Sequence, residues 1–587
     1  MKRILSMLLV VIMLFGTLCV LTACGEPKDD GAEISVYLGD EVFDFDPTDY
    51  YVDSNAEQVM SLIFEPLFKI NKKGELGCAA AKKYSVNEKE RKIVINLRES
   101  YWSDEVRVKA SDFIYAWRDI ILEPNNPNPA AALFYDIENA VKIKNGEESL
   151  YSFGAVASDT YEITITYREG ANYKQLLKNL ASVSASPLRE DIVSVAKSHW
   201  SKSMTTIVTN GPFKIEALNH ELGDFTLARN LGFHQKPTAK KYTDKVNPAS
   251  LISFFTKDGE LELTYADIVE KTVFYMGDAT LEDRKNNESK ATVASDFSTY
   301  TYVFNTDNPL FANKNVRKAL SLALNRQAIA EAVTFGNAAT GFLPNPVAKS
   351  VYGKKIDARI AAEAAMEAAM DEAKSLINSA NLGSISKSFT LTVNDDEESV
   401  AIAELAKVAW QELGFNVTVK KVGSVSTTIK DTSTSEDITI QDSAIQALVK
   451  EASYGKRDFD VIAVDWQMYS NDAFVALSAF TSHMNGNGKN FSTGALNENI
   501  SGWTNADYDS YMNAAYAAKN DKERKAALAE AEKILLDSCP VIPVLYNESF
   551  AFISKDLSKV SIDAFGNFSF TGAKQKNYRK YLESESE

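Results

Sequence analysis

The chain has 587 residues, of which 45 % are hydrophobic and 24 % are charged, as is usual for a soluble globular protein. This length exceeds what one hydrophobic core supports, so two or three domains are expected. The formal net charge is −17, and it becomes −19 if a leader carrying Lys2 and Arg3 is removed. Nucleic acid is therefore excluded as a partner, because binding phosphates requires clustered positive charge.

The four cysteines and four histidines are too scattered to predict a metal site. We therefore expect no metal and no cofactor. Outside the N-terminal segment that holds Cys19 and Cys24, the cysteines are Cys78 and Cys539. They allow two interpretations, a disulfide formed in an oxidising compartment or two separate buried thiols, and the second is favoured.

The N-terminus carries signals for export and lipid attachment. Two basic residues precede an apolar run, Ile4 to Leu21, which fits either a transmembrane anchor or a cleaved export signal. Leu-Thr-Ala-Cys24 favours the second, because it resembles a bacterial lipobox. Residues 1–23 are then a lipoprotein signal peptide and 24–34 a polar tether. Acyl chains on Cys24 would hold the protein on the extracytoplasmic face of the cell membrane.

A strand, a turn and a helix are predicted between Lys92 and Arg118. Apolar residues alternate along 93–97, which indicates a strand with one buried face. A polar turn at 99–104 ends the strand, and Ser111 is expected to cap the helix. One face of that helix is apolar and consists of Phe113, Ile114, Trp117, Ile120 and Ile121.

A second unit, between Phe389 and Val419, predicts a strand, a helix and another strand. Alternating apolar residues mark both strands, and the amphipathic helix between them ends at Gly414. This order and spacing indicate a parallel, right-handed βαβ crossover. The polar, Ser/Thr-rich segment 423–455 that follows is predicted to be a surface insertion.

A candidate ligand site follows the short apolar strand 460–464. Ligands of open α/β sheets bind beyond the carboxyl ends of such strands. Aromatic and carboxylate side chains at this place suit a polar organic ligand, and they are Asp465, Trp466, Tyr469 and Asp472. Asp472 has a second interpretation, as the cap of a helix beginning near Ala473, and that interpretation is slightly favoured.

Several motifs in one order resemble the peptide/nickel-type extracellular solute-binding proteins of ABC importers, family 5. They include Trp102-Ser-Asp, Tyr115-Ala-Trp-Arg, Asn210-Gly-Pro-Phe, Asn315-Val-Arg-Lys-Ala and Gly502-Trp503-Thr-Asn. The resemblance covers nearly all of the mature chain and is nearest in character to the oligopeptide-binding proteins. Two departures stand out. Glu105 replaces the usual Gly after the turn, and Tyr469 replaces the Asp that pairs with a peptide's α-ammonium.

The resemblance implies an α/β, two-lobe periplasmic-binding-protein-like fold (type II, cluster C) with an inserted domain and a hinge. Lobe I is expected at 35–66, 206–300 and 546–587, the inserted domain II at 67–205, and lobe II (domain III) at 301–545. The implied ligand contacts are Tyr50, Tyr51, Asp465, Trp466, Tyr469, Asp472 and Trp503.

The implied function is that of a monomeric, non-enzymatic receptor that delivers peptide, or another small polar solute, to a membrane permease. Because residue 469 is Tyr and not Asp, two alternatives stay open. Either Asp472 or Asp465 pairs with the α-ammonium of the peptide, or the receptor does not require a free amino terminus and tolerates blocked and long peptides. A surface peptide sensor would share every motif. An exported hydrolase is disfavoured, because no Gly-x-Ser-x-Gly or His-Glu-x-x-His motif occurs.

Overall fold

The computed structural model describes residues 31–49, 54–220, 223–239, 241–255, 263–352, 366–430 and 437–578. The predicted signal peptide (1–23), Cys24 and the candidate contacts Tyr50 and Tyr51 lie outside these ranges. Within them, no helix combines the length and the apolar character that a membrane span requires.

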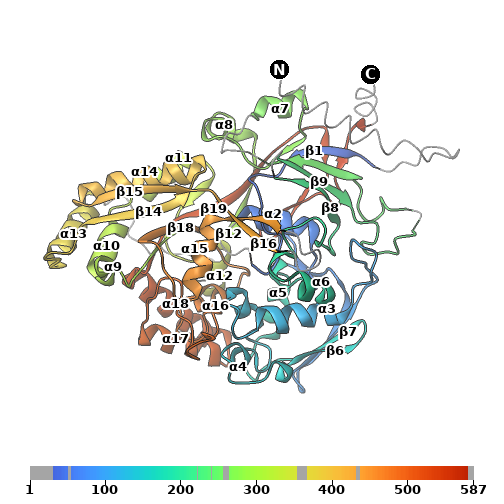
Figure 1. The fold of residues 1–587 in the computed structure, drawn as a ribbon, viewed down its shortest axis with the longest axis horizontal. Helices are drawn as coiled ribbons and strands as arrows, with labels where there is room; N and C mark the ends of the chain where they lie inside the picture. The colour runs from blue at the N-terminus through green and yellow to red at the C-terminus, as the bar shows by residue number, and fades with distance from the viewer. Residues whose placement is uncertain are drawn as a thin grey trace.

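One large mixed sheet runs through the molecule and joins two lobes (Figure 1). Its strand order is β15-β14-β18-β12-β19-β11-β1-β10-β9-β8, and β13 (Gly336–Ala338) also pairs with β19. The second lobe supplies β15 (Asn416–Val422), β14 (Ser388–Asn394) and β18 (Val461–Gln467). The first lobe supplies β11 (Tyr275–Met276), β1 (Glu33–Tyr37), β10 (Ser250–Phe254), β9 (Asp224–Arg229) and β8 (Phe213–Asn219). Its helices include α2 (Ser54–Ile63), α7 (Tyr265–Glu270) and α8 (Leu281–Asn287).

Two long antiparallel strands, β12 (Thr292–Phe304) and β19 (Val541–Ile553), cross from one lobe to the other. β19 pairs with β11 on the first-lobe side, and β12 pairs with β18 on the second-lobe side. The register of the pair shifts between Ser295 and Thr299. Because a shift interrupts the ladder and lets the strands bend, this is where the expected hinge fits. The domain boundaries stay a prediction.

The predicted βαβ unit is confirmed in the second lobe. β14 and β15 are parallel, and α14 (Glu397–Glu412) connects them. Phe389, Leu391 and Val393 are buried, as their alternation predicts. The other helices of this lobe are α9 (Pro309–Ala312), α10 (Lys314–Leu322), α11 (Arg326–Val333), α12 (Asn345–Tyr352), α13 (Met366–Ser379), α16 (Ala473–Ser478), α17 (Ala506–Ala517) and α18 (Asp521–Ser538).

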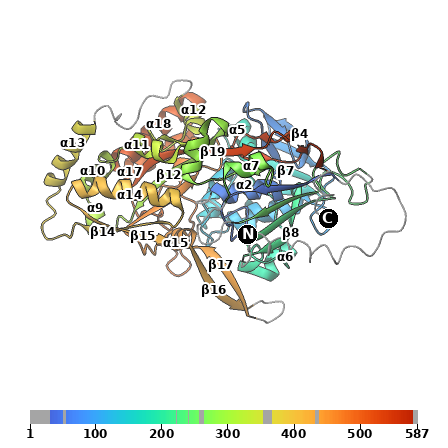
Figure 2. The same ribbon diagram turned by 90° about the horizontal axis from the view of Figure 1, so that it is seen from above.

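The prediction of a surface insertion at 423–455 is wrong for its second half. β16 (Ser424–Lys430) and β17 (Asp437–Ser443) form a hairpin that projects from the molecule (Figure 2). α15 (Ala444–Ser453), in contrast, packs against the body of the protein. Its buried residues Ile445, Val449 and Ala452 follow helical spacing, which the polar average of the segment conceals.

The inserted domain has its own antiparallel sheet, in the order β4-β5-β7-β6. These strands are β4 (Ala81–Asn87), β5 (Lys92–Leu97), β7 (Glu162–Thr166) and β6 (Ala155–Asp159). Its helices are α3 (Ala110–Ile114), which continues as the π-helix η1 (Tyr115–Ile121), and α4 (Ala140–Lys144), α5 (Tyr173–Asn179) and α6 (Glu190–Ala196).

The helix predicted after the turn is present, but its cap is not Ser111. Lys109 is the N-cap residue, and Asp112 accepts hydrogen bonds from the Lys109 backbone N–H (2.9 Å) and from Trp102 Nε1 (3.0 Å). The structure therefore joins the turn to the helix through Trp102 and Asp112. Phe113, Ile114, Trp117 and Ile121 of the predicted apolar face are buried.

The two cysteines in the described part of the chain are free thiols. Cys78 ends β3 (Leu76–Cys78), which pairs with β2 (Phe68–Ile70). Cys539 lies beyond α18, where its thiol donates to the carbonyl of Leu536 (2.8 Å). The interpretation as two separate thiols is confirmed, although only Cys539 is buried and Cys78 is partly exposed, and the disulfide is wrong.

Candidate ligand-binding cleft

A cavity with a volume of about 660 Å³ lies between the two lobes. From the first lobe it is lined by residues between 38 and 58 and between 275 and 284. From the second lobe it is lined by 394–399, by the bases of β16 and β17, and by the end of β18. The crossing strands β12 and β19 contribute the remaining wall, so a hinge motion there would change the cavity directly.

A polar group on three adjacent strands forms the wall nearest the crossing. Asn547 of β19 donates to Asp465 Oδ1 of β18 (2.6 Å) and to Ser298 Oγ of β12 (2.9 Å). Burial raises the pKa of Asp465 well above its usual range, and burial raises the pKa of Asp296 to about 7. The cleft therefore holds carboxyl groups that are poorly solvated in the ligand-free protein.

On one side of the cavity, α8 of the first lobe contacts α14 of the second. Arg284 pairs with Asp278 (2.6 Å) and with Glu398 across the lobe boundary. The backbone N–H of Leu281 donates to Glu397 Oε2 (3.0 Å). The side chain of Arg284 is 9 % exposed, so this ion pair is largely shielded from solvent.

On the other side, the first-lobe loop before α2 contacts the segment 442–450. Lys450 Nζ lies 2.6 Å from Asp49 Oδ2, and Gln446 donates to the Asp49 carbonyl. Lys202 of the inserted domain pairs with both Asp44 (3.3 Å) and Asp442. Two separate sets of contacts thus hold the lobes together.

Among the predicted ligand contacts, Asp465 lines this cavity, whereas Trp466 and Tyr469 are packed elsewhere. Trp466 is 8 % exposed and stacks on Phe480 (ring centroids 4.9 Å apart). Tyr469 is 4 % exposed and has a left-handed backbone (φ 55°). The neighbouring Ser470 donates to Asn179 of the inserted domain (2.7 Å). This loop therefore lies at a domain interface, and its role in ligand contact stays a prediction.

Asp472 is the N-cap of α16, so that interpretation is confirmed. Its Oδ1 accepts from the Phe474 backbone N–H (3.1 Å), and its Oδ2 pairs with Arg524 of α18 (2.7 Å). Both oxygens are thus engaged within the protein, and its role as a ligand contact stays a prediction.

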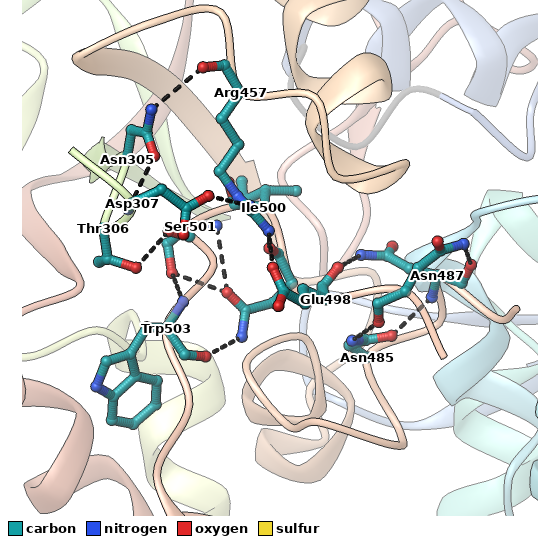
Figure 3. Close-up of polar contacts among 12 residues, drawn as sticks. Asn305, Thr306, Asp307, Arg457, Asn485, Asn487, Glu498, Ile500, Ser501 and Trp503 are labelled. Carbon is teal, nitrogen blue, oxygen red and sulfur yellow. Dashed lines mark hydrogen bonds and ion pairs between the residues drawn. The ribbon is translucent and has the colours of Figure 1, made fainter. Parts of the chain in front are cut away.

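Trp503 lies at the end of a polar network that orders the loop before α17 (Figure 3). Asn499 Nδ2 donates to the Trp503 carbonyl (2.6 Å), and the Trp503 N–H donates to Ser501 Oγ (3.2 Å). Arg457 pairs with Asp307 (2.6 Å) and Glu498 (2.8 Å) at the other end of this network. The indole is 7 % exposed and packs against Tyr508, and the role of Trp503 as a ligand contact stays a prediction.

Sequence reasoning missed most of the residues that line the cavity, including Asp296, Tyr300, Arg284 and Asn547. One signal was visible. β14 ends at Asn394 and is followed by Asp-Asp-Glu-Glu398. Ligands of open α/β sheets bind beyond the carboxyl ends of parallel strands, and β14 is parallel to β18, so these carboxylates were also candidates. The residues of β12 and β19 gave no such signal, because their role comes from strand pairing across more than 200 positions.

Comparison with known proteins identifies the family. Residues 75–488 match the family described as bacterial extracellular solute-binding proteins, family 5. The chain is 25 % identical to the oligopeptide-binding protein OppA of Bacillus subtilis, over 96 % of this chain and 98 % of the relative. It is also 25 % identical to the dipeptide-binding protein DppE of B. subtilis, over 84 % and 82 % of the two chains.

Solved structures share the fold. The murein tripeptide binding protein MppA of Escherichia coli superposes with a TM-score of 0.74 at 21 % identity, covering 94 % of this chain and 99 % of that chain. The unliganded open form of MppA gives a TM-score of 0.56. The predicted fold class and the prediction of a binding protein rather than an enzyme are confirmed. The chain belongs to family 5 of the bacterial extracellular solute-binding proteins.

Proposed function

We propose that this protein is the lipid-anchored receptor of an ABC importer, which captures oligopeptides between its lobes and hands them to a membrane permease. Membership of the solute-binding family supports the receptor role. The named ligands of two relatives that match along most of the chain, OppA and DppE of B. subtilis, support peptides as the cargo. The cavity volume lies within the range of about 300–1,000 Å³ that is usual for ligand sites.

The observation that carries the proposal is the placement of the cavity between two lobes that are joined by two separate sets of polar contacts. Arg284–Glu398 and Lys450–Asp49 join the two lobes, so opening the lobes to admit a peptide would break both ion pairs. A ligand that contacts both lobes would favour the closed arrangement by its differential affinity for that arrangement. This is the behaviour expected of a receptor that signals its loaded state to a permease.

The test uses a cavity-blocking variant and a matched control on one strand. Ser424 lines the cavity at the start of β16, whereas Thr428 lies farther along the same strand and is exposed. Ser424→Trp should abolish the stabilisation by a peptide pool, which is about 2.7 kcal/mol at a hundredfold excess over Kd. Thr428→Trp should keep it. Thermal denaturation measures both, and mass spectrometry of co-purified small molecules identifies the native ligand.

Two results would contradict the proposal. Equal peptide stabilisation of the Ser424→Trp and Thr428→Trp proteins would place binding outside this cavity. Progressive cleavage of the peptide pool by pure protein would favour an exported hydrolase.

The lipid anchor is tested separately through Cys24, the acylation site that the lipobox-like segment predicts. Cys24→Ala should block processing, so the protein should keep its apolar leader and should take up no labelled fatty acid in the native host. Cys19→Ala, in the same apolar run, is the control and should be processed normally. Normal processing of the Cys24→Ala protein with unchanged fatty-acid labelling would refute the anchor.

A further inference from the structure

The cleft has a large excess of negative charge. Among its described lining residues, ten are Asp or Glu, one is Arg and one is His. The whole chain has 80 acidic and 63 basic residues, so its general acidity predicts nearly equal numbers of each sign. The excess is therefore specific to the cleft.

The start of α14 accounts for part of this charge. Asp396 caps this helix, and Glu397 and Glu398 lie in its first turn, where carboxylates interact favourably with the helix dipole. The helix does not account for the carboxylates on the opposite lobe, on the crossing strands and on β18 of its own lobe. These are Asp40, Glu41, Asp278, Asp296, Asp465 and Glu548.

The basic side chains that line the cleft already have acidic partners. Arg284 lies between Asp278 and Glu398, and His220 Nδ1 lies 2.6 Å from Glu41 Oε1. Asp465 accepts a hydrogen bond from the neutral amide of Asn547, and Asp296 lies beside the neutral hydroxyls of Ser298 and Ser549. The charged neighbours that raise the pKa of Asp465, after burial itself, are Glu398, Asp396 and Asp296.

A buried hydroxyl next to these carboxylates has unused hydrogen-bonding capacity. Tyr300 lines the cavity, is 3 % exposed, and is the β12 partner of Asp465 in the sheet. In the described part of the chain its Oη makes no hydrogen bond of normal geometry, although Ser399 lies beside it. Buried hydroxyls are usually paired, so this one points to a polar ligand group at the acidic wall.

We infer that the cleft selects organic cations, and that the peptides it captures carry Lys or Arg side chains. This inference rests on the proposed function. Carboxylates enclosed by closing lobes are stable as anions only when cations pair with them. Ammonium and guanidinium groups of a ligand supply that charge, and the Tyr300 hydroxyl can accept a hydrogen bond from them. A metal ion fits less well, because the described Asp, Glu, His and Cys side chains form no group of three able to hold one.

Three tetrapeptides with the same free termini test the charge selection. They are Ala-Lys-Lys-Ala, Ala-Ala-Ala-Ala and Ala-Glu-Glu-Ala, titrated calorimetrically into the intact protein. The Lys peptide should bind about tenfold tighter than the Ala peptide or better, and the Glu peptide should bind weakest. Because the termini are identical, the difference reports side-chain charge and not recognition of the amino end.

A double variant, and a control that replaces the same number of carboxyl groups elsewhere, locate the effect. Asp395→Asn with Asp465→Asn removes two cleft carboxylates with little change in shape, and should reduce the Lys-to-Ala affinity ratio about tenfold. Glu147→Gln with Glu148→Gln replaces the same number of carboxyl groups on an exposed loop of the inserted domain, and should keep the ratio. Thermal denaturation checks that each variant is folded.

The outcomes separate this inference from the proposed function. Equal affinity for the Lys, Ala and Glu peptides overturns the charge selection and leaves the peptide receptor intact. Spermidine, a polyamine cation that is not a peptide, is titrated in the same way. If it binds and none of the peptides does, the charge selection stands and the proposed peptide receptor is overturned. A ratio unchanged in the Asp395/Asp465 variant, or reduced equally in the Glu147/Glu148 control, overturns the assignment to this cleft.

Discussion

Glu105 has a backbone conformation that usually belongs to glycine. Its φ is 67°, and its N–H donates to the carbonyl of Trp102 (2.9 Å), which closes the turn after β5. The side chain is exposed. Replacing Gly by Glu therefore left the left-handed turn in place, and the Cβ of Glu105 adds the strain that this region imposes on L-residues.

Glu105→Gly should stabilise the protein. Removing the Cβ relieves strain of about 1–2 kcal/mol, and the added freedom of the unfolded chain offsets part of that gain. The expected rise in the free energy of unfolding is up to about 1 kcal/mol, measured by denaturant unfolding. Glu148→Gly is the control, since Glu148 is exposed and has a negative φ, and it should destabilise slightly. A lower stability of the Glu105→Gly protein would show that the strain argument is wrong.

Asp472 and Asp465 show what local sequence can and cannot tell. The capping role of Asp472 was visible from the helix that follows it. Its ion pair with Arg524 was not, because 52 residues separate the two. Likewise, the position of Asp465 at the end of a strand predicted a cleft residue, but its partner Asn547 lies on a strand 82 residues away.

Asp472→Asn should lower the stability of the protein, whereas Asp465→Asn should not. Asp472→Asn breaks an ion pair whose side chains are 6 % and 13 % exposed, which should lower the free energy of unfolding by about 3 kcal/mol. Asp465→Asn replaces a carboxyl whose pKa burial raises, so stability near neutral pH should be unchanged or higher. Urea unfolding at pH 7 compares them. A large loss for Asp465→Asn would mean that its charge stabilises the ligand-free fold.

At the scale of elements, regular patterns were predictable and irregular ones were not. The βαβ unit of β14, α14 and β15 follows from alternation and helical spacing within about 35 residues. The β16–β17 hairpin projects from the body of the protein and mixes exposed Val425 with buried Ile440, so its sequence does not mark one continuous buried face. The contact between α8 and α14 depends on charges more than 110 positions apart, which no local pattern contains.

Arg284→Gln should loosen the closure of the lobes. It leaves Asp278 and Glu398 facing each other without the cation between them, and like charges at such distances repel. We expect a larger radius of gyration in the ligand-free protein by small-angle X-ray scattering, and weaker peptide binding. Lys285→Gln, on the same helix with an exposed side chain, should change neither. An unchanged radius for Arg284→Gln would show that this ion pair does not control closure.

At the scale of the whole molecule, motif order was sufficient to predict the family and the two-lobe fold. It was not sufficient to predict the cavity, because that is built from several separate segments of both lobes. Each segment supplies a few carboxylates that look like ordinary surface charge in sequence. Only folding brings them together, and their mutual repulsion and burial then alter how the protein responds to pH.

Stability of the ligand-free protein should decrease as pH rises from about 5 to 7. Burial raises the pKa of Asp296 and of Asp46 to about 7, and burial raises the pKa of Asp563 to about 6. A carboxyl with a raised folded pKa binds its proton more tightly in the folded state. Its stabilising effect is therefore complete below the unfolded pKa of about 4 and is lost as pH rises through the folded value. Lys144, whose pKa burial lowers to about 7, changes stability mainly above that pH.

Thermal denaturation across this pH range measures the effect, and the melting temperature should fall by a few degrees. Asp296→Asn should flatten the profile, because the amide does not titrate. Glu148→Gln, on an exposed loop, should leave it unchanged. Ala-Lys-Lys-Ala should stabilise the protein more at pH 7 than at pH 5, since the cleft carboxyls must lose their protons to pair with it. A melting temperature that rises from pH 5 to 7 without ligand would show that these buried carboxyls are not the groups that control stability.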